Sequence, residues 1–327
     1  ASIYEALTDE EDARVCDDLD ATACKERPYS FTLILVCSFL TKLGDELSSP
    51  KTTLAWAATV VGAPAFVLGF LVPIRESGSM IPQLFIGSYL RRLPIRKWAW
   101  VAGSLVQFMA VAAMGVSVLL LDGAAAGWAL IGCVTVFSLA RGFCSVASKD
   151  VMGKTIPKSR RGQLTGWSAS MAGLVTLGVS ITLLFFLDDA PAEVLIGLIL
   201  VVAGFFWLLA SLLYAQIDEQ PGETGGGRSA LEALGRLRLL IDDRPFQRFV
   251  ITRALLMCSA LSAPFYVALA QQEQGSPSWL LGSFLLASGL ASLVSAPFWG
   301  RQADRSSRSV MVAAALVTAG IGLTTFL

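Results

Sequence analysis

The residues of this 327-residue chain that could do chemistry are charged side chains set in otherwise apolar segments. Lys42, Asp45 and Glu46 are spaced i, i+3 and i+4, so a helix would carry all three on one face. Arg75 and Glu76 form a second charged group in the next apolar stretch. The sequence contains no histidine, which leaves proton transfer near neutral pH to carboxylates. These five side chains predict a site where an acid exchanges a proton and a base pairs with a charged ligand.

The composition predicts a membrane protein. Hydrophobic residues make up 54% of the chain and charged residues only 15%, which is more apolar side chain than a soluble domain can bury. The net charge is zero, so a nucleic acid is not an expected partner. The six cysteines form no CxxC pair and are interpreted as packing residues. Without histidine, a Gly-x-Ser-x-Gly sequence or a Walker loop, we expect neither an enzyme nor a bound metal or cofactor.

Apolar runs of about 20 residues, the length that crosses a bilayer, predict most of the helices. The clear runs are 98–121, 128–147, 164–187, 192–217, 246–270, 279–298 and 309–327. We therefore predict an all-α polytopic membrane protein.

Charged residues interrupt the first apolar stretch, 31–91. Segment 246–300 has nearly the length of 31–87 and holds two helices, so we predict two long helices in the first stretch as well. These are expected at 31–60 and 65–91, joined at 62–64. We expect Pro50 and Pro73 to break their regular hydrogen bonding. In an alternative interpretation, 74–79 is a turn outside the membrane and half of the candidate site is lost.

The loops alternate in charge, which predicts the orientation. Lys and Arg gather in the loops after the second, fourth, sixth and eighth predicted helices, whereas the other loops carry only acids. Basic residues accumulate on the cytoplasmic side, so the N-terminus is expected there, in a multi-pass protein of the cell (inner) membrane.

The same pattern predicts the domain organisation. We expect an acidic cytoplasmic tail at 1–29, a six-helix bundle at 30–217, a cytoplasmic linker at 218–245 and a partial second bundle at 246–327. Within the linker, apolar residues at helical spacing in 228–241 predict an amphipathic helix, either at the membrane interface or packed on the bundle.

Two loop sequences carry a family resemblance. After the eighth predicted helix the chain reads Gly300-Arg301-Gln302-Ala303-Asp304-Arg305-Ser306-Ser307-Arg308, and after the second it reads Gly87-Ser88-Tyr89-Leu90-Arg91-Arg92-Leu93-Pro94-Ile95-Arg96-Lys97. With six helices, a linker and a second set that begins like the first, the chain resembles the major facilitator superfamily, whose signature loop is G-x-L-a-D-R-x-G-R-K and whose halves are parallel repeats. The loop after the second predicted helix departs from the signature, because Arg91 stands where the family has Asp.

The resemblance implies gating residues and a further intramembrane base. The implied gating residues are Gly87, Arg91, Arg92, Arg96, Lys97, Gly300, Asp304, Arg305 and Arg308. Ordinary positive-inside charge is the alternative, and it explains the arginines but not the Gly-Ala-Asp-Arg order. Leu139-Ala140-Arg141-Gly142 is similar to the family's intramembrane arginine motif, although Arg141 could instead extend to the inner headgroups. The Gly-Pro of the family's antiporter signature is not met in 164–187.

These observations predict a polar central cavity for substrate and proton. Its expected residues are Lys42, Asp45, Glu46, Arg75, Glu76, Gln83, Arg141 and Arg253. Charges in the membrane are costly unless they face water or one another. The alternative is therefore a set of structural ion pairs that only join the first two helices, namely Lys42 with Asp45 or Glu46 and Arg75 with Glu76 or Asp45.

The function expected from this resemblance is secondary active transport by alternating access, coupled to a proton or another ion. The expected partners are a small ionisable organic solute and the lipid bilayer, and the chain is expected to act as a monomer. Compared with a complete member, the end of helix 9 and helices 10 to 12 would be missing. The alternative function is a non-transporting membrane regulator or scaffold of the same fold.

Overall fold

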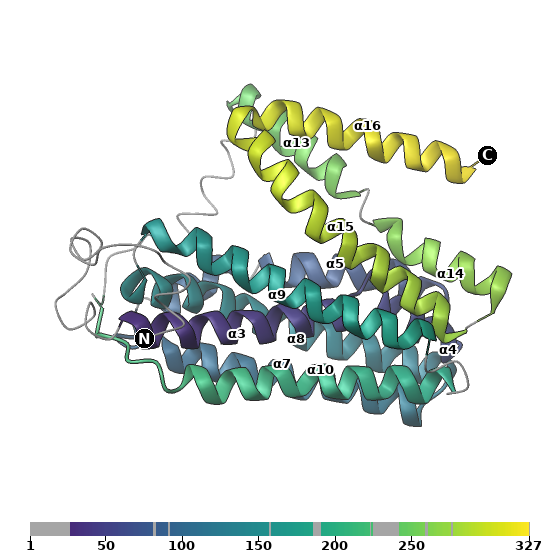
Figure 1. Ribbon diagram of the computed structural model, residues 1–327, viewed down its shortest axis with the longest axis horizontal. Helices are drawn as coiled ribbons and strands as arrows, with labels where there is room; N and C mark the ends of the chain where they lie inside the picture. The colour runs from purple at the N-terminus through teal and green to yellow at the C-terminus, as the bar shows by residue number, and fades with distance from the viewer. Residues whose placement is uncertain are drawn as a thin grey trace.

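The computed structural model confirms the all-helical fold class. It describes residues 27–80, 83–90, 92–156, 158–185, 191–222, 224, 242–258, 261–275 and 277–326. Within these ranges every regular element is a helix. The expected amphipathic helix at 228–241 and nearly all of the acidic tail lie outside the described residues. Figure 1 shows a bundle of long, roughly parallel helices with a smaller group of helices against one side.

Four long helices of the bundle lie close to expected apolar runs. They are α7 (Lys97–Leu120), α8 (Gly123–Thr155), α9 (Lys158–Phe185) and α10 (Ala192–Tyr214). Helix α8 extends beyond the expected 128–147 at both ends, so Lys149 and Lys154 lie on its last turns rather than in a loop. Four described helical stretches are long and apolar enough to cross a membrane, namely Lys97–Leu120, Gly123–Thr155, Leu164–Phe185 and Ala192–Tyr214. A fifth, Arg244–Gln274, also qualifies, although it includes residues 259–260, which lie outside the described ranges.

The expected helix at 31–60 is divided in two. Helix α3 (Arg27–Leu47) ends before Pro50, and α4 (Thr53–Val60) follows it. Proline lacks an amide hydrogen and its ring excludes the preceding turn, which confirms the expected break there. Gly62, with a φ of 67°, then turns the chain toward α5, as expected for the junction at 62–64.

The expected helix at 65–91 is also divided, but not where the sequence suggested. Helix α5 (Phe66–Met80) runs through Pro73, and α6 (Gln83–Leu90) follows it. Both the expected break at Pro73 and the alternative turn at 74–79 are therefore wrong. Pro73 removes a single hydrogen bond of the helix, and inside a bundle the neighbouring turns retain theirs.

The second group of helices corrects two further expectations. The single helix expected at 246–270 is two helices, α13 (Arg244–Cys258) and α14 (Ala263–Gln274), because Pro264 occupies the first turn of α14 and favours a new helix start. Helix α15 (Ser278–Arg305) continues through the first six residues of the motif that begins at Gly300, so the expected loop is reduced to a short junction at Ser306. Helix α16 (Ser307–Phe326) completes the group.

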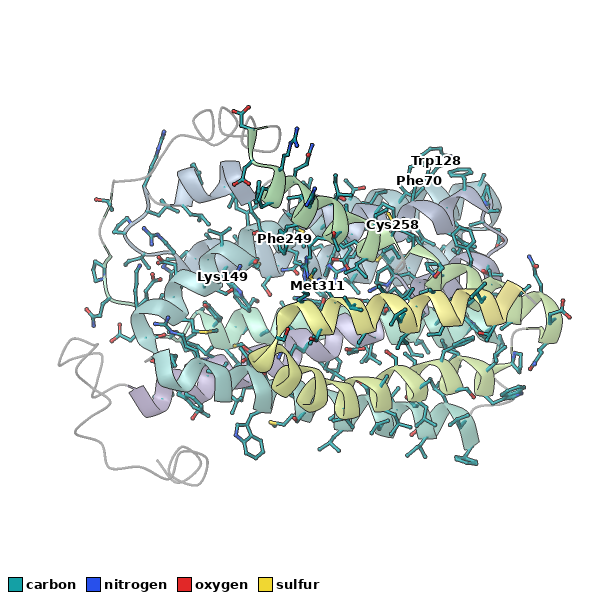
Figure 2. The ribbon with its side chains drawn as sticks, turned by 90° about the horizontal axis from the view of Figure 1, so that it is seen from above. Phe70, Trp128, Lys149, Phe249, Cys258 and Met311 are labelled. Carbon is teal, nitrogen blue, oxygen red and sulfur yellow. The ribbon has the colours of Figure 1, made fainter. Side chains whose placement is uncertain are left out.

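The bundle core combines close backbone approach with large buried rings. Helix α7 packs on α8 and α10, and a Cβ added to Gly115 would lie 2.6 Å from the carbonyl oxygen of Gly197 on α10. Trp207 and Phe137 are buried edge to face, with ring centroids 5.2 Å apart. Large apolar side chains such as Phe70 and Trp128 cover the outer surface (Figure 2), as expected for a chain solvated by lipid.

The two ends of the bundle differ in charge. The basic end contains the start of α3, the segment 92–97, the end of α8 and residues 214–222 (left in Figure 1). The opposite end holds the α4–α5 turn and the start of α8, where the amide of Gly123 donates to the carbonyl of Val61 at 2.7 Å.

The two groups of helices meet toward this opposite end. Helix α15 packs along α9, and α14 contacts α4 and α5. A Cβ on Gly282 of α15 would lie 3.0 Å from the carbonyl oxygen of Ser180, and one on Gly289 would lie 3.2 Å from the side chain of Leu177. At the basic end, α15 and α13 diverge from the bundle (Figure 1).

Candidate functional site

The centre of the candidate site is one carboxylate shared by two arginines. Arg75 Nη2 lies 2.6 Å from Asp45 Oδ1, and Arg141 Nη1 lies 2.5 Å from the same oxygen. The three residues come from α5, α3 and α8, so this cluster joins three helices through charge-assisted hydrogen bonds. The sequence prediction included all three residues, and it left open whether Arg141 faces the cavity or the headgroups. The contact with Asp45 shows that Arg141 points into the protein.

The two arginines differ in their surroundings. The side chain of Arg75 is 9% exposed, and its guanidinium carbon lies 3.9 Å from the ring centroid of Phe137. Cation–π contact of this kind stabilises a guanidinium that is withdrawn from water. The side chain of Arg141 is 38% exposed. Arg75 is therefore fixed by packing, whereas Arg141 has room to move.

The charged cluster lies on the wall of a cavity of about 910 Å³, which we call the central cavity. It contains most of the predicted site residues, namely Lys42, Asp45, Glu46, Arg75, Glu76 and Arg141. Lys42, Asp45 and Glu46 share one helix face, as their spacing predicted. The far wall comes from α9 and α15, including Gly173 and Ser288, so the cavity lies between the two groups of helices.

Lys42 does not form the ion pair considered from the sequence. Its ammonium nitrogen donates to the carbonyl oxygen of Thr165 on α9, at 2.7 Å. The same carbonyl oxygen accepts the hydroxyl of Ser168 at 3.0 Å, and it lies where α9 packs against α3. Lys42 therefore links α3 to α9, and the local Lys42–Asp45 pair is replaced by the two arginines.

Two predicted residues are not among those that line the central cavity. Gln83 donates to the carbonyl of Ser79 at 2.9 Å, a local contact at the α5–α6 junction. Arg253, on α13, lines a separate cavity of about 590 Å³ between α5, α13 and α16, together with Glu76. Lys51 lines both cavities and was not predicted. The sequence feature that could have identified Lys51 is its position directly after Pro50, at the break between α3 and α4.

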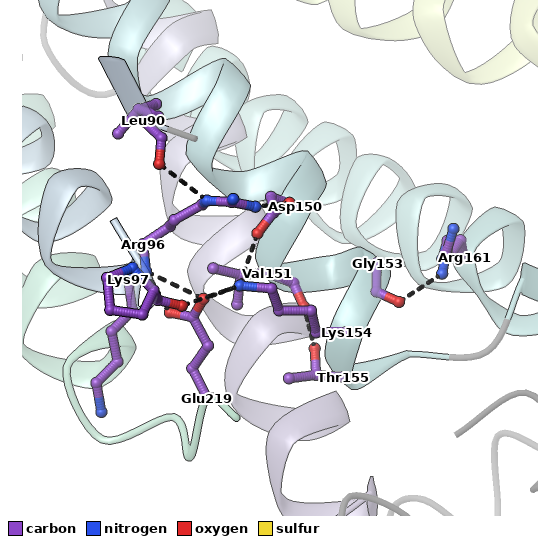
Figure 3. A network of polar contacts seen from close by, with 11 residues as sticks. Leu90, Arg96, Lys97, Asp150, Val151, Gly153, Lys154, Thr155, Arg161 and Glu219 are labelled. Carbon is purple, nitrogen blue, oxygen red and sulfur yellow. Dashed lines mark hydrogen bonds and ion pairs between the residues drawn. The ribbon is translucent and has the colours of Figure 1, made fainter. Parts of the chain in front are cut away.

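A second polar network lies at the basic end, shown in Figure 3. Arg96 forms an ion pair with Asp150, and Lys154 lies 2.9 Å from the same carboxylate. Lys154 also lies 2.8 Å from Glu219, whose side chain is fully buried. Glu219 accepts the backbone amides of Arg96 and Lys97 at 2.8 and 2.6 Å, where α7 begins. A carboxylate at this position complements the positive end of the helix dipole.

The network includes two of the predicted gating residues and two acids that were missed. Arg96 and Lys97 are buried or half-buried in it. Asp150 could have been found from its i, i+4 spacing to Lys154. Glu219 is an acid directly after a long apolar run, but its reach back to α7 depends on tertiary structure.

The other predicted gating residues divide into those that the structure places elsewhere and those that it does not describe. Gly87 is on α6, and Gly300 is on α15. Arg92 and Arg308 are exposed. Arg91 lies outside the described residues, as do the side chains of Asp304 and Arg305.

Comparison with known families accounts for the helical fold. The family model described as Major Facilitator Superfamily matches residues 30–327. The chain belongs to the major facilitator superfamily. This superfamily consists of transporters rather than enzymes, so the chain is a multi-pass membrane protein of a transporter family. No curated protein sequence matches the chain significantly.

The central cavity of this chain is lined by many charged side chains. Its walls carry four bases and three acids, which are Lys42, Lys51, Arg75, Arg141, Asp45, Glu46 and Glu76. Within the described part of the chain, no group of three His, Cys, Asp or Glu residues is arranged to hold a metal ion. The arrangement can bind an ionisable ligand by exchanging partners within the cluster, and its carboxylates can accept protons.

Proposed function

We propose that the chain is a secondary active transporter that moves a small ionisable organic solute through the central cavity, coupled to protons. The observation that carries this proposal is the carboxylate of Asp45, held by two arginines on the wall of a cavity between the two groups of helices. Charges buried at this depth in a membrane bundle are functional as a rule.

Exchange of partners in this cluster provides a mechanism for coupling. An anionic group of the solute takes the place of Asp45 as the partner of Arg141, the more exposed of the two arginines. A carboxylate that loses a cationic partner in surroundings poor in water binds a proton more readily. Solute binding and protonation of Asp45 therefore favour each other, and release of one promotes release of the other.

The contacts between the two groups of helices support alternating access. They lie toward the end of the bundle opposite the basic end, along α9 and α15 and between α14 and α4. We propose that the basic end is cytoplasmic in the cell (inner) membrane, with the N-terminus on that side. The structure then corresponds to a state closed to the outside. Rocking one group of helices against the other would separate α9 from α15 and bring the basic ends together.

Transport in proteoliposomes tests the proposal. The purified protein is reconstituted with a pH-sensitive dye inside and offered pooled amino acids, organic acids, sugars and organic cations. We expect one pool to move protons, and we expect Asp45→Asn, Glu46→Gln or Glu76→Gln to abolish this movement. Asp122→Asn is the matched control, because Asp122 is exposed at the start of α8 and is not among the cavity residues.

Folded protein that moves neither protons nor labelled solutes from any pool would contradict the proposal. That outcome would favour the alternative of a non-transporting regulator or scaffold. Arg91, which stands in the position of the family's acid, is the sequence feature that keeps this alternative open.

A further inference from the structure

A second cavity meets the central cavity at the charged cluster. This second cavity, which we call the bundle cavity, has a volume of about 260 Å³ and lies inside the bundle of long helices, between α3, α7, α8 and α10. Lys42, Asp45 and Arg141 line both cavities. The Asp45–Arg141 ion pair therefore forms part of the wall between the two cavities, and Asp45 borders both of them.

The bundle cavity extends from this wall toward the basic end. On α3 its lining runs from Asp45 back to Ile34, a distance of about 16 Å along the helix axis. On α8 the lining runs from Arg141 to Met152. Arg96 and Asp150, the ion pair of the basic-end network, therefore lie near the far end of the cavity, since Asp150 is two residues before Met152.

The lining of the bundle cavity suits water rather than a solute. Polar side chains from three helices line it, namely Ser38, Thr41, Gln107, Ser145 and Ser148. The volume is sufficient for several water molecules, each of which needs two or more polar partners. At the far end, the rings of Trp100 and Tyr214 stack with centroids 3.9 Å apart, and both residues are buried. A stacked, buried pair of large rings at this position hinders an organic solute far more than it hinders water.

We propose that the bundle cavity is a water-filled route by which protons pass between the cytoplasm and Asp45, separate from the path of the solute. The inference rests on the proton coupling proposed above. A hydronium ion formed in the cavity from a cytoplasmic proton transfers that proton to a carboxylate oxygen of Asp45. The new O–H bond forms on Asp45, and the electron pair of the broken bond stays on the oxygen that becomes a neutral water. When solute and proton are instead carried inward together, the reverse transfer releases the proton of Asp45 to the cytoplasm.

The charges around Asp45 fit such a route. Arg75 faces it from α5, Arg141 from α8, and Lys42 and Glu46 from α3. Glu76 and Lys51 line the central cavity as well. The residues that α7 and α10 contribute to the bundle cavity are Trp100, Gln107, Trp207 and Tyr214, which are neutral near pH 7. The bundle cavity thus lacks a second acid among its lining residues, and Asp45 is its proton acceptor.

Separation of the two paths has a mechanistic consequence. The solute contacts the cluster from the central cavity while the proton arrives from the bundle cavity, so both can be bound at once. Arg141 is part of the wall between the two paths and is the less buried arginine. Its displacement by the solute connects the presence of solute to the protonation of Asp45.

The first test measures water in the cavity of the wild-type protein. In hydroxyl-radical footprinting, side chains beside bound water are oxidised faster than dry core side chains. Cys144 is 7% exposed and lines the bundle cavity, whereas Met114 is 2% exposed and packs in the apolar core. Because a thiol and a thioether differ in intrinsic reactivity, each oxidation rate is divided by the rate of the same residue in the unfolded chain. We expect Cys144 to be less protected than Met114. Equal protection of both would overturn the proposal whatever the transport assay shows.

The second test blocks the route. Ser145→Leu, on α8, fills the bundle cavity. Ser117→Leu, near the C-terminal end of α7, is the matched control, because Ser117 is not among the residues that line this cavity. We expect Ser145→Leu to slow solute-driven proton movement in proteoliposomes about tenfold or more, while exchange of labelled solute for unlabelled solute stays at the wild-type rate. Unchanged proton movement in Ser145→Leu would overturn the separate route alone. Absence of proton movement in the wild type would overturn the proposed coupling and the route with it. If Ser145→Leu does not fold, the footprinting result decides.

Discussion

Asp45 Oδ1 on α3 lies 2.5 Å from Arg141 Nη1 on α8, and this pair closes a triangle of charge with Arg75 of α5. The triangle contains two positive charges and one negative charge, so Asp45 is the residue on which both arginines depend. Removing one member of such a cluster lowers the stability of the protein, and the loss is larger when the charge left without a partner is buried.

We predict that Asp45→Asn lowers the stability of the purified protein much more than Arg141→Gln. Loss of the carboxylate leaves the buried Arg75 without its ion-pair partner, at a cost of about 3–5 kcal/mol. Arg141→Gln leaves the Asp45–Arg75 pair intact, so we expect a smaller loss. The apparent melting temperature in detergent measures both. Glu76→Gln, a half-buried acid on α5, is the control. Equal losses for Asp45→Asn and Arg141→Gln would contradict this ranking.

We also predict that Glu219→Ala destabilises the basic end. The buried carboxylate accepts two amides at the start of α7 and pairs with Lys154, so its removal leaves several donors without an acceptor. From helix capping and a charge-assisted bond we expect a loss of about 2–4 kcal/mol. Thermal unfolding and limited proteolysis after α10 measure the effect. The neighbouring Asp218→Ala is the control, because Asp218 is exposed. Similar losses for both variants would show that burial of Glu219 contributes little.

Much of the fold could be predicted because lipid imposes length and polarity on each helix. The runs that became α7, α9 and α10 were found within a few residues at most ends, since their apolar stretches end at charged or glycine-rich loops. The breaks within the expected helices were harder to predict, because they depend on individual prolines. Pro50 and Pro264 each stand near a break, whereas Pro73 lies inside α5 without breaking it. One local rule predicts all three as breaks, and the surrounding helices decide which of them occur.

The candidate site could be predicted in part for a related reason. Charge in an apolar segment is visible in the sequence, so Asp45, Arg75 and Arg141 were all identified as site residues. The Asp45–Arg75 pair was among the ion pairs considered from the sequence, whereas the Asp45–Arg141 pair was not, because it joins residues far apart in the chain. The sequence favoured a local partner for Lys42, and the structure instead gives it a backbone carbonyl of α9.

Close backbone packing inside the bundle gives a third prediction. A Cβ at Gly115 would lie 2.6 Å from a backbone carbonyl of α10, and backbone cannot move aside as a side chain can. We expect Gly115→Ala to lower stability by about 1–3 kcal/mol, the usual cost of overpacking. A Cβ at Gly132 would have no atom within 4 Å, so Gly132→Ala should be neutral or slightly stabilising. Melting temperatures in detergent compare the two, and a tolerated Gly115→Ala would mean that α7 and α10 are less tightly packed than in the structure.

The contact between α9 and α15 gives the last prediction, because alternating access requires this contact to open. A Cβ at Gly173 would lie 3.4 Å from Cγ of Leu293, so cysteines at these two positions are close enough for a disulfide or a short thiol cross-linker. The pair Gly173→Cys with Leu293→Cys is made in a chain whose six native cysteines are replaced. We expect oxidation to abolish net solute uptake and reducing agent to restore it.

The control for this cross-link keeps one cysteine and moves the other. Gly132→Cys with Leu293→Cys should be insensitive to oxidation, because a Cβ at Gly132 has open space around it and α15 is not among its neighbours. Gly173 and Leu293 lie where the α9–α15 contact borders the central cavity, and the basic ends of the two groups stay apart, so a locked protein should still bind solute from the proposed cytoplasmic side. Solute binding that is retained while uptake is lost separates a locked conformation from a damaged cavity. Full uptake by the cross-linked protein would show that α9 and α15 do not separate during transport, and the rocking movement proposed for this chain would then be wrong.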